Sequence, residues 1–131
     1  MKVVSGKRKR AIAKASFKKG TGKIKVNNKL LEDYAPKMYV LKMKEPLLLV
    51  PEVAKKIDIN ITVKGGGING QAEAVRLVIS KAIIEFSKSK EVEETFLDYD
   101  RTLLVADVRR KEKRKPNTAG KARAKVQKSY R

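Results

Sequence analysis

The chain has 131 residues, and its 33 Lys and Arg against 14 Asp and Glu give a formal net charge of +19. Because a freely dissolved enzyme gains nothing from such self-repulsion, we expect a polyanionic partner, either nucleic acid or an anionic membrane surface. The chain has no Cys and no His, which excludes disulfides, Cys/His zinc sites, thiolate nucleophiles and imidazole bases, so we expect no enzyme activity, no metal and no cofactor.

The excess charge lies at the two ends of the chain. Residues 1–25 hold ten basic side chains and no acid, residues 109–131 hold eleven basic side chains and one acid, and the residues between them are nearly neutral. The sequence therefore predicts one globular RNA-binding domain over residues 1–108. It also predicts an extended basic tail over residues 109–131, because the charge and the Pro, Asn and Gly content of this segment oppose collapse.

The sequence argues against a membrane partner. No apolar run exceeds four residues, and no hydrophobic stretch follows Lys2, which excludes membrane spans and secretory signals. Neither basic end has the pattern of an amphipathic helix, so a role on a membrane surface is disfavoured as well. We expect a cytosolic protein with a nucleic-acid partner.

In chain order, the first predicted element is a hairpin. Apolar side chains alternate from Ala11 to Phe17, Gly20–Gly22 turns the chain, and Ile24 and Val26 alternate with lysines. The lysines of these strands are expected on the face away from the core, beside the basic cluster of residues 7–10. A merely solvated strand face does not account for ten basic side chains without a carboxylate, so this face is predicted to bind RNA. Its candidate residues are Lys7, Arg8, Lys9, Arg10, Lys14, Lys18 and Lys23.

Two short helices are expected after a turn at Asn27–Asn28. They cover residues 34–44 and 47–56, with Pro46 between them. Residues 57–63 then alternate strictly between apolar and polar side chains, which predicts a strand with one face on the core.

The second half of the domain is predicted to be mainly helical. Residues 71–87 carry a broad apolar stripe at helical spacing and predict a central helix packed on the sheet. A short helix over residues 91–96 and an apolar patch over residues 103–106 are expected before the tail.

A glycine-rich loop joins the predicted strand to the predicted central helix. Gly65, Gly66, Gly67 and Gly70, followed by Gln71, satisfy G-x-G-x-x-G, but the segment after the helix is too polar to be the second parallel strand of a dinucleotide-binding unit. Two interpretations remain open. The loop is either a tight connection that needs positive φ and close backbone approach, or its amides and the helix N-terminus bind a phosphate of RNA.

The tail has the pattern of an RNA ligand. In an extended strand, the alternation of basic and small residues over 121–126 places cations on one side at intervals of roughly 6.6–7 Å, which suits a sugar–phosphate backbone. Nonspecific solubilising charge, the alternative, does not require this pattern. The predicted RNA contacts of the tail are Arg109, Arg110, Arg114, Lys121, Arg123 and Lys125.

Three stretches of the sequence resemble one universal family over essentially the whole chain. Gly6–Ala13 with Gly20–Ile24, Gly65–Gly67 running into Gly70–Gln71, and the ending Gln127–Arg131 are similar to the ninth protein of the small ribosomal subunit, in its archaeal type. This resemblance implies an α/β (α+β) two-layer sandwich like the second domain of the fifth small-subunit ribosomal protein, with a left-handed crossover and a long extended basic tail.

The resemblance also implies a structural, non-enzymatic constituent of the small subunit. Such a protein binds ribosomal RNA in the subunit head, among neighbouring ribosomal proteins and not as a homo-oligomer. Its tail is expected to reach the peptidyl-site tRNA through Lys128, Tyr130 and Arg131. The alternative function is that of a free RNA chaperone or another nonribosomal nucleic-acid-binding protein.

Two positions depart from the family pattern. Val108 stands where Pro usually follows the acid that precedes the first tail arginines, and Val126 stands where an aromatic side chain is frequent. The resemblance therefore does not extend to the entry angle of the tail or to one stacking contact.

Overall fold

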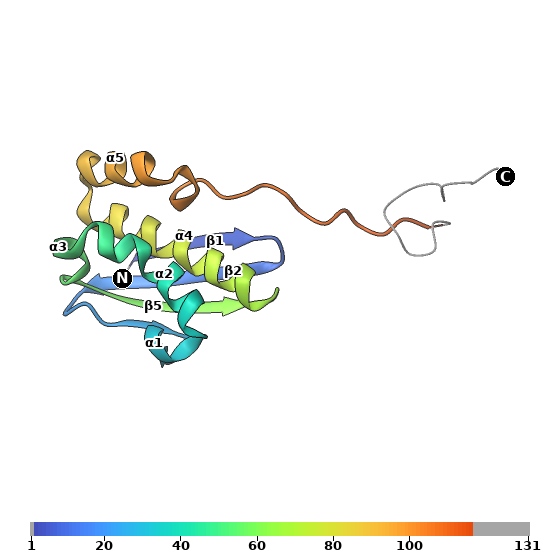
Figure 1. Ribbon diagram of the computed structural model, residues 1–131, viewed down its shortest axis with the longest axis horizontal. Coiled ribbons are helices and arrows are strands. Elements are labelled where there is room, and N and C mark those ends of the chain that lie inside the picture. Colours follow the sequence, from blue (N-terminus) through green and yellow to red (C-terminus); the bar gives the residue numbers. More distant parts are fainter. Residues whose placement is uncertain (1, 117–131) are drawn as a thin grey trace.

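The computed structural model describes residues 2–116, in which a five-stranded sheet carries helices on one face (Figure 1). The sheet order is β1-β2-β5-β3-β4, and all neighbours are antiparallel except β3 and β5. The strands are β1 (Lys2–Arg8), β2 (Ala11–Lys19), β3 (Ile24–Val26), β4 (Lys29–Leu30) and β5 (Ile57–Lys64). The helices are α1 (Leu31–Tyr34), α2 (Lys37–Leu49), α3 (Pro51–Ala54), α4 (Ile68–Ser87), α5 (Lys90–Tyr99) and the 3-10 turn η1 (Arg101–Leu103). This mixed α/β architecture confirms the predicted fold class.

The core lies between α4 and one face of the sheet. Buried side chains alternate with exposed ones along β2 and β5, and α4 buries a broad apolar stripe that includes Val75, Val78 and Ile79. Glycine at position 6 lets β1 approach the helix, because a Cβ there would lie 2.9 Å from Leu77 Cδ2. The predicted strand over residues 57–63 and the predicted central helix are both confirmed, and the helix begins at Ile68, three residues earlier than predicted.

The predicted hairpin between residues 11–17 and 24–26 is wrong. β2 pairs with β1 and β5, whereas β3 pairs with β5 and β4. The reason lies in Asp58, whose Oδ1 accepts hydrogen bonds from the backbone N–H groups of Thr21 (2.8 Å) and Lys23 (2.9 Å). These bonds hold the 20–23 loop over the start of β5, so the chain crosses β5 and β3 pairs on its other edge. The hairpin partner of β2 is β1, which sequence alternation does not reveal because Val3 and Val4 are adjacent.

Pro46 does not separate two helices, so the boundaries predicted around it are wrong. α2 runs from Lys37 to Leu49 with Pro46 inside it, and the short α3 follows from Pro51. A proline removes one helical hydrogen bond, but Pro46 is fully buried and α2 packs against α4. Tertiary packing therefore compensates for the missing backbone donor.

The last elements close the core before the tail. The predicted helix over residues 91–96 is confirmed as the longer α5, and its Phe96 is fully buried together with Leu103 of η1. Residues 108–116 are exposed. In the part of the chain that the structure describes, no helix is long and apolar enough to cross a membrane, and no group of three or more carboxylates could hold a metal ion.

Candidate nucleic-acid interface

A basic groove of about 980 Å³ lies where three segments meet: the β1–β2 turn, the glycine loop and the residues after η1. Figure 1 shows the chain leaving η1 past this end of the sheet. Six of the ten lining residues are basic and none is acidic. The lining residues are Arg8, Lys9, Arg10, Gly66, Gly67, Asn69, Gly70, Arg109, Arg110 and Lys111. The groove thus joins basic residues from both charged ends of the sequence.

The glycine loop lies tightly against the β1–β2 turn. Gly65 and Gly66 have φ of 76° and 69°, in the left-handed region that favours glycine. A Cβ on Gly65 would lie 2.6 Å from the carbonyl oxygen of Arg10, and one on Gly66 would lie 3.0 Å from the backbone nitrogen of Ala11. The interpretation as a tight connection with positive φ and close backbone approach is therefore confirmed.

Gln71 supports this loop from within the fold. Its Nε2 donates a hydrogen bond to the Gly65 carbonyl oxygen (3.1 Å), and its Oε1 accepts one from the Tyr34 hydroxyl (2.7 Å). Among the described residues no strand follows α4, so the second parallel strand of a dinucleotide-binding unit is missing there, as the polar sequence indicated.

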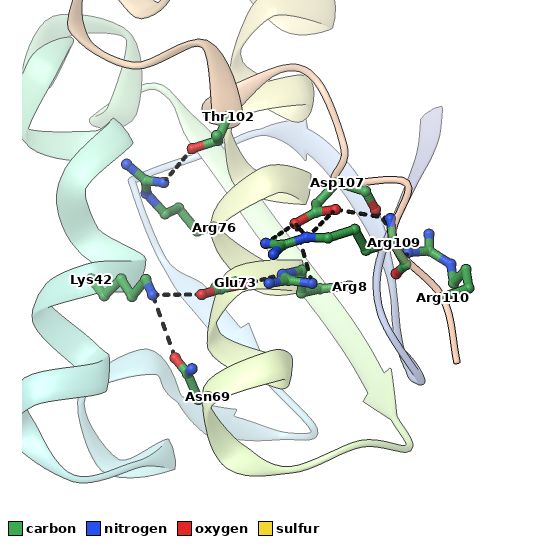
Figure 2. Close-up of polar contacts among 9 residues, drawn as sticks. All are labelled: Arg8, Lys42, Asn69, Glu73, Arg76, Thr102, Asp107, Arg109 and Arg110. Carbon is green, nitrogen blue, oxygen red and sulfur yellow. Dashed lines mark hydrogen bonds and ion pairs between the residues drawn. The ribbon is translucent and has the colours of Figure 1, made fainter. Parts of the chain in front are cut away.

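Arg8 faces the helices and is anchored by ion pairs (Figure 2). Its Nε donates to Glu73 Oε2 on α4, and its Nη1 lies 3.4 Å from Asp107 Oδ2. Lys42 of α2 pairs with the other Glu73 oxygen, Oε1, at 2.9 Å. Burial raises the pKa of Glu73, but hydrogen bonds from Lys42 and Arg8 outweigh it and hold that pKa below its ordinary value. This predicted RNA-binding residue therefore has protein partners and only 16% side-chain exposure.

Asp107 joins Arg8 to the segment 107–111, here called the tail root (Figure 2). Its Oδ2 accepts hydrogen bonds from Arg109 Nη2 (2.6 Å) and Nε (2.9 Å), and its Oδ1 accepts one from the Arg109 backbone N–H (2.9 Å). Hydrogen bonds from the Arg109 side chain and backbone hold the pKa of Asp107 well below its usual range. Arg110 Nη1 donates to the Asp107 carbonyl oxygen at 2.7 Å.

A second basic surface covers the sheet on the side away from the helices, here called the open face. Lys14 and Lys18 of β2 and Lys25 of β3 alternate with buried neighbours and are exposed, as predicted. Lys18, Lys23 and Lys25 help to line a hollow of about 310 Å³ there. Asp58 also lines it, but its carboxylate is engaged by the loop amides described above, which hold its pKa below the ordinary value.

The structure thus divides the sequence-predicted RNA residues between two surfaces. Lys9, Arg10, Arg109 and Arg110 share the basic groove with the inward-facing Arg8, whereas Lys7 is exposed on β1, paired with Ile12. Arg114 is exposed in the chain beyond the groove. The remaining predicted contacts lie outside the described residues: Lys121, Arg123, Lys125, Lys128, Tyr130 and Arg131.

Sequence reasoning missed several residues of this region. Lys111 and Asn69 line the groove without having been singled out, and Asp107 was noted only as the acid before Val108. The spacing Asp107-x-Arg109 was the available signal, because a carboxylate two residues before an arginine can accept from both its side chain and its amide.

Comparison with known proteins identifies the family. A family model described as ribosomal protein S9/S16 matches residues 6–131. The chain belongs to this family. Curated relatives called small ribosomal subunit protein uS9 are similar over the full length of both chains. The protein of Methanococcus maripaludis is 52% identical, that of Methanococcus vannielii 50% and that of Methanothrix thermoacetophila 47%.

Membership of the S9/S16 family decides between the functions left open by the sequence. A member of this family is a structural, non-enzymatic part of a ribonucleoprotein that acts in translation on the cytoplasmic ribosome. The family therefore favours the ribosomal interpretation over a free RNA chaperone, and it explains the polyanionic partner that the net charge required.

Proposed function

We propose that this protein, as a constituent of the small ribosomal subunit, binds ribosomal RNA of the subunit head through its basic groove. The observation that carries the proposal is the convergence of six basic residues, the inward-facing Arg8 and five others, without an acid in one groove of about 980 Å³. Such a groove attracts the phosphate backbone, whose contacts dominate the affinity of proteins for nucleic acid. The family and the relatives named for the small subunit support ribosomal RNA as the partner.

The residues of the groove suit phosphate in different ways. Arginine presents a planar fork of donors to phosphate oxygens, whereas lysine acts as a compact point charge. Nothing lies within 4 Å of the place where a Cβ of Gly67 would stand, which leaves room for a phosphate on that side of Gly67, the residue before α4. The open face then supplies a second contact through Lys14, Lys18 and Lys25.

The tail completes the proposed function. By resemblance to the family, residues 121–125 follow the RNA backbone, and Lys128, Tyr130 and Arg131 contact the tRNA in the peptidyl site. The groove is the place where this tail leaves the domain, since Arg109, Arg110 and Lys111 line it.

A triple substitution tests the groove. We expect Lys9→Ala/Arg10→Ala/Arg110→Ala to lower affinity for small-subunit ribosomal RNA at least tenfold and to impair incorporation into reconstituted subunits, since about 1.4 kcal/mol of lost contact already costs tenfold. The matched control is Lys55→Ala/Lys56→Ala/Lys88→Ala, which removes the same charge from exposed positions. Lys55 and Lys56 precede β5 and Lys88 follows α4, so these lysines lie at the other end of the sheet. Equal affinity of the two variants would refute RNA binding by the groove.

A truncation tests the tRNA contact. Deleting residues 129–131 removes the proposed tRNA contacts at Tyr130 and Arg131 and leaves the groove intact. We expect normal assembly of the small subunit but faster dissociation of tRNA from the peptidyl site. An unchanged dissociation rate in subunits that carry the truncated protein contradicts the contact.

A further inference from the structure

One acid stands at the edge of the most basic surface of the molecule. Asp107 precedes Arg109, Arg110 and Lys111, and its side chain is 25% exposed. By charge alone, a carboxylate at this place repels the phosphates that the groove is proposed to bind. We therefore looked for a favourable effect of Asp107 on RNA binding that outweighs this repulsion.

The contacts of Asp107 show what it holds together. The same oxygen, Oδ2, lies 3.4 Å from Arg8 Nη1 and accepts from Arg109 Nε and Nη2, so one carboxylate bridges β1 and the tail root. The backbone N–H of Arg109 donates to the other oxygen. The bridge therefore sets both the guanidinium and the backbone direction of Arg109.

Arg8, the residue that links this bridge to the folded domain, is held by further ion pairs. Arg8 is paired with Glu73 of α4, and Glu73 is paired with Lys42 of α2, so the anchor extends through two packed helices (Figure 2). On the other side, residues 108–116 are exposed, and Val108 is 86% exposed. Asp107 thus marks the boundary between the packed domain and the exposed chain.

Arg109 keeps donors for a ligand while it is held. A guanidinium has five N–H donors, and the bridge to the carboxylate uses those on Nε and Nη2. Arg110 is also held at this corner, through its hydrogen bond to the Asp107 carbonyl oxygen. Both arginines are therefore preorganised beside the glycine loop, which lowers the entropy cost of binding.

From these contacts we propose that Asp107 is a positioning residue for RNA binding, which holds the tail root against the β1–β2 turn so that Arg109 and Arg110 line the groove. This inference rests on the proposed function of the groove. It reverses the expectation from charge: removing this acid weakens binding to RNA, although the protein becomes more positive.

The experiment compares Asp107→Asn with Glu112→Gln in the full-length protein. Both substitutions remove one negative charge from the chain after η1, but Glu112 pairs with Lys115, three residues further along the same segment, at 2.6 Å. Affinity for small-subunit ribosomal RNA is measured across a salt series. We expect Asp107→Asn to weaken binding about fivefold to tenfold, whereas Glu112→Gln leaves affinity equal or higher.

The salt dependence distinguishes positioning from a loss of stability. If Arg109 and Arg110 leave the groove, the slope of log K against log salt becomes shallower by about 1.4, which is about 0.7 for each lost phosphate contact. We expect this change in Asp107→Asn while circular dichroism and the thermal unfolding midpoint stay close to wild type. We also expect Asp107→Glu, which keeps the carboxylate, to restore most of the slope.

Two results overturn the inference: Asp107→Asn binds as tightly as Glu112→Gln, or it binds more weakly with an unchanged salt slope. The groove variant described above separates this failure from that of the proposed function. If that variant loses affinity and Asp107→Asn does not, only the positioning role is wrong. If the groove variant itself retains affinity, the groove is not the RNA site.

Discussion

Gly65 and Gly67 stand two residues apart in the same loop and have different surroundings. Gly65 has a φ of 76°, and a Cβ there would lie 2.6 Å from the carbonyl oxygen of Arg10. Gly67 has a φ of −98°, and nothing lies within 4 Å of the position of its Cβ. Of these two positions, only 65 requires glycine, although the sequence has glycine at both.

Alanine at these two positions gives a matched pair. We expect Gly65→Ala to lower the free energy of unfolding by roughly 2–4 kcal/mol, because it combines a left-handed backbone with a clash against the β1–β2 turn. We expect Gly67→Ala to lower it by less than about 1 kcal/mol, the cost of a poorer helix N-cap. Urea unfolding of both variants measures the difference. If both variants lose the same free energy of unfolding, close contact between Gly65 and the β1–β2 turn does not contribute to stability.

The carboxyl group of Asp107 gives a residue-scale prediction about pH. Its pKa is depressed in the folded protein, chiefly by the Arg109 side chain. The contribution of its contacts to stability is therefore complete above the unfolded pKa, near 3.9, and is lost progressively as the pH falls from there through the lower folded pKa. We expect the carboxyl resonance of Asp107 to titrate well below pH 3.9 by NMR, and Arg109→Ala to move the midpoint up towards 3.9. A wild-type midpoint already at 3.9 contradicts the bridge.

At the scale of elements, a buried arginine joins three helical segments. Arg76 of α4 is 9% exposed, and its Nη2 lies 2.5 Å from Glu45 Oε2 of α2 and 3.1 Å from Asp100 Oδ2, just before η1. Its Nη1 donates to Thr102 Oγ1 at 3.1 Å. These contacts hold η1, and with it the start of the tail, against the two helices.

Substitution of Arg76 tests this junction. We expect Arg76→Met to lower the free energy of unfolding by about 2–3 kcal/mol, because it leaves two partly buried carboxylates without their cation. Arg101→Met, at an exposed position of η1, is the control and is expected to change it by less than about 0.5 kcal/mol. If the two variants unfold at the same urea concentration, the buried network does not stabilise the junction.

The elements also show how far sequence patterns reach. Strict alternation found β5 and β2, and helical spacing found α4, because these elements bury one face and leave the other exposed. The same reasoning missed β1, where Val3 and Val4 are adjacent. It also ended a helix at residue 44, before Pro46, although Pro46 is buried inside α2. It also paired the wrong strands, because adjacency in sequence favours a hairpin. The sequence pattern does not show the hydrogen bonds that the loop amides donate to Asp58, and these bonds place β3 on the far edge of β5.

At the scale of the whole molecule, two basic surfaces are arranged around a nearly neutral fold. The basic groove joins both ends of the chain, and the open face presents lysines on β2 and β3. The sequence suggested two separate basic attachments. The fold instead places the first of the tail cations beside the N-terminal cluster, which is the arrangement that the proposed binding of one RNA segment to both requires.

The contribution of the open face is measured by salt dependence. We expect Lys14→Ala/Lys18→Ala/Lys25→Ala to make the slope of log K against log salt shallower by about 2, which is about 0.7 for each of three phosphate contacts on single-stranded RNA. The far-end lysine variant used as a control for the groove removes the same charge and is expected to keep the wild-type slope. If both variants keep that slope, the open face is only solvated and the groove alone binds RNA.

The sequence by itself determined the class of partner from the charge, the main helix and strands from the hydrophobic periodicity, and the family from short motifs. These properties can be read from the order of the residues without knowing the fold. Only the tertiary structure decided which strands are neighbours, why Gly65 must be glycine, and that Arg8 faces inward while Arg109 and Arg110 line a groove with Lys9 and Arg10. The physical reason is that these facts depend on contacts between residues far apart in the chain, such as Arg8 with Asp107 and Asp58 with the 20–23 loop.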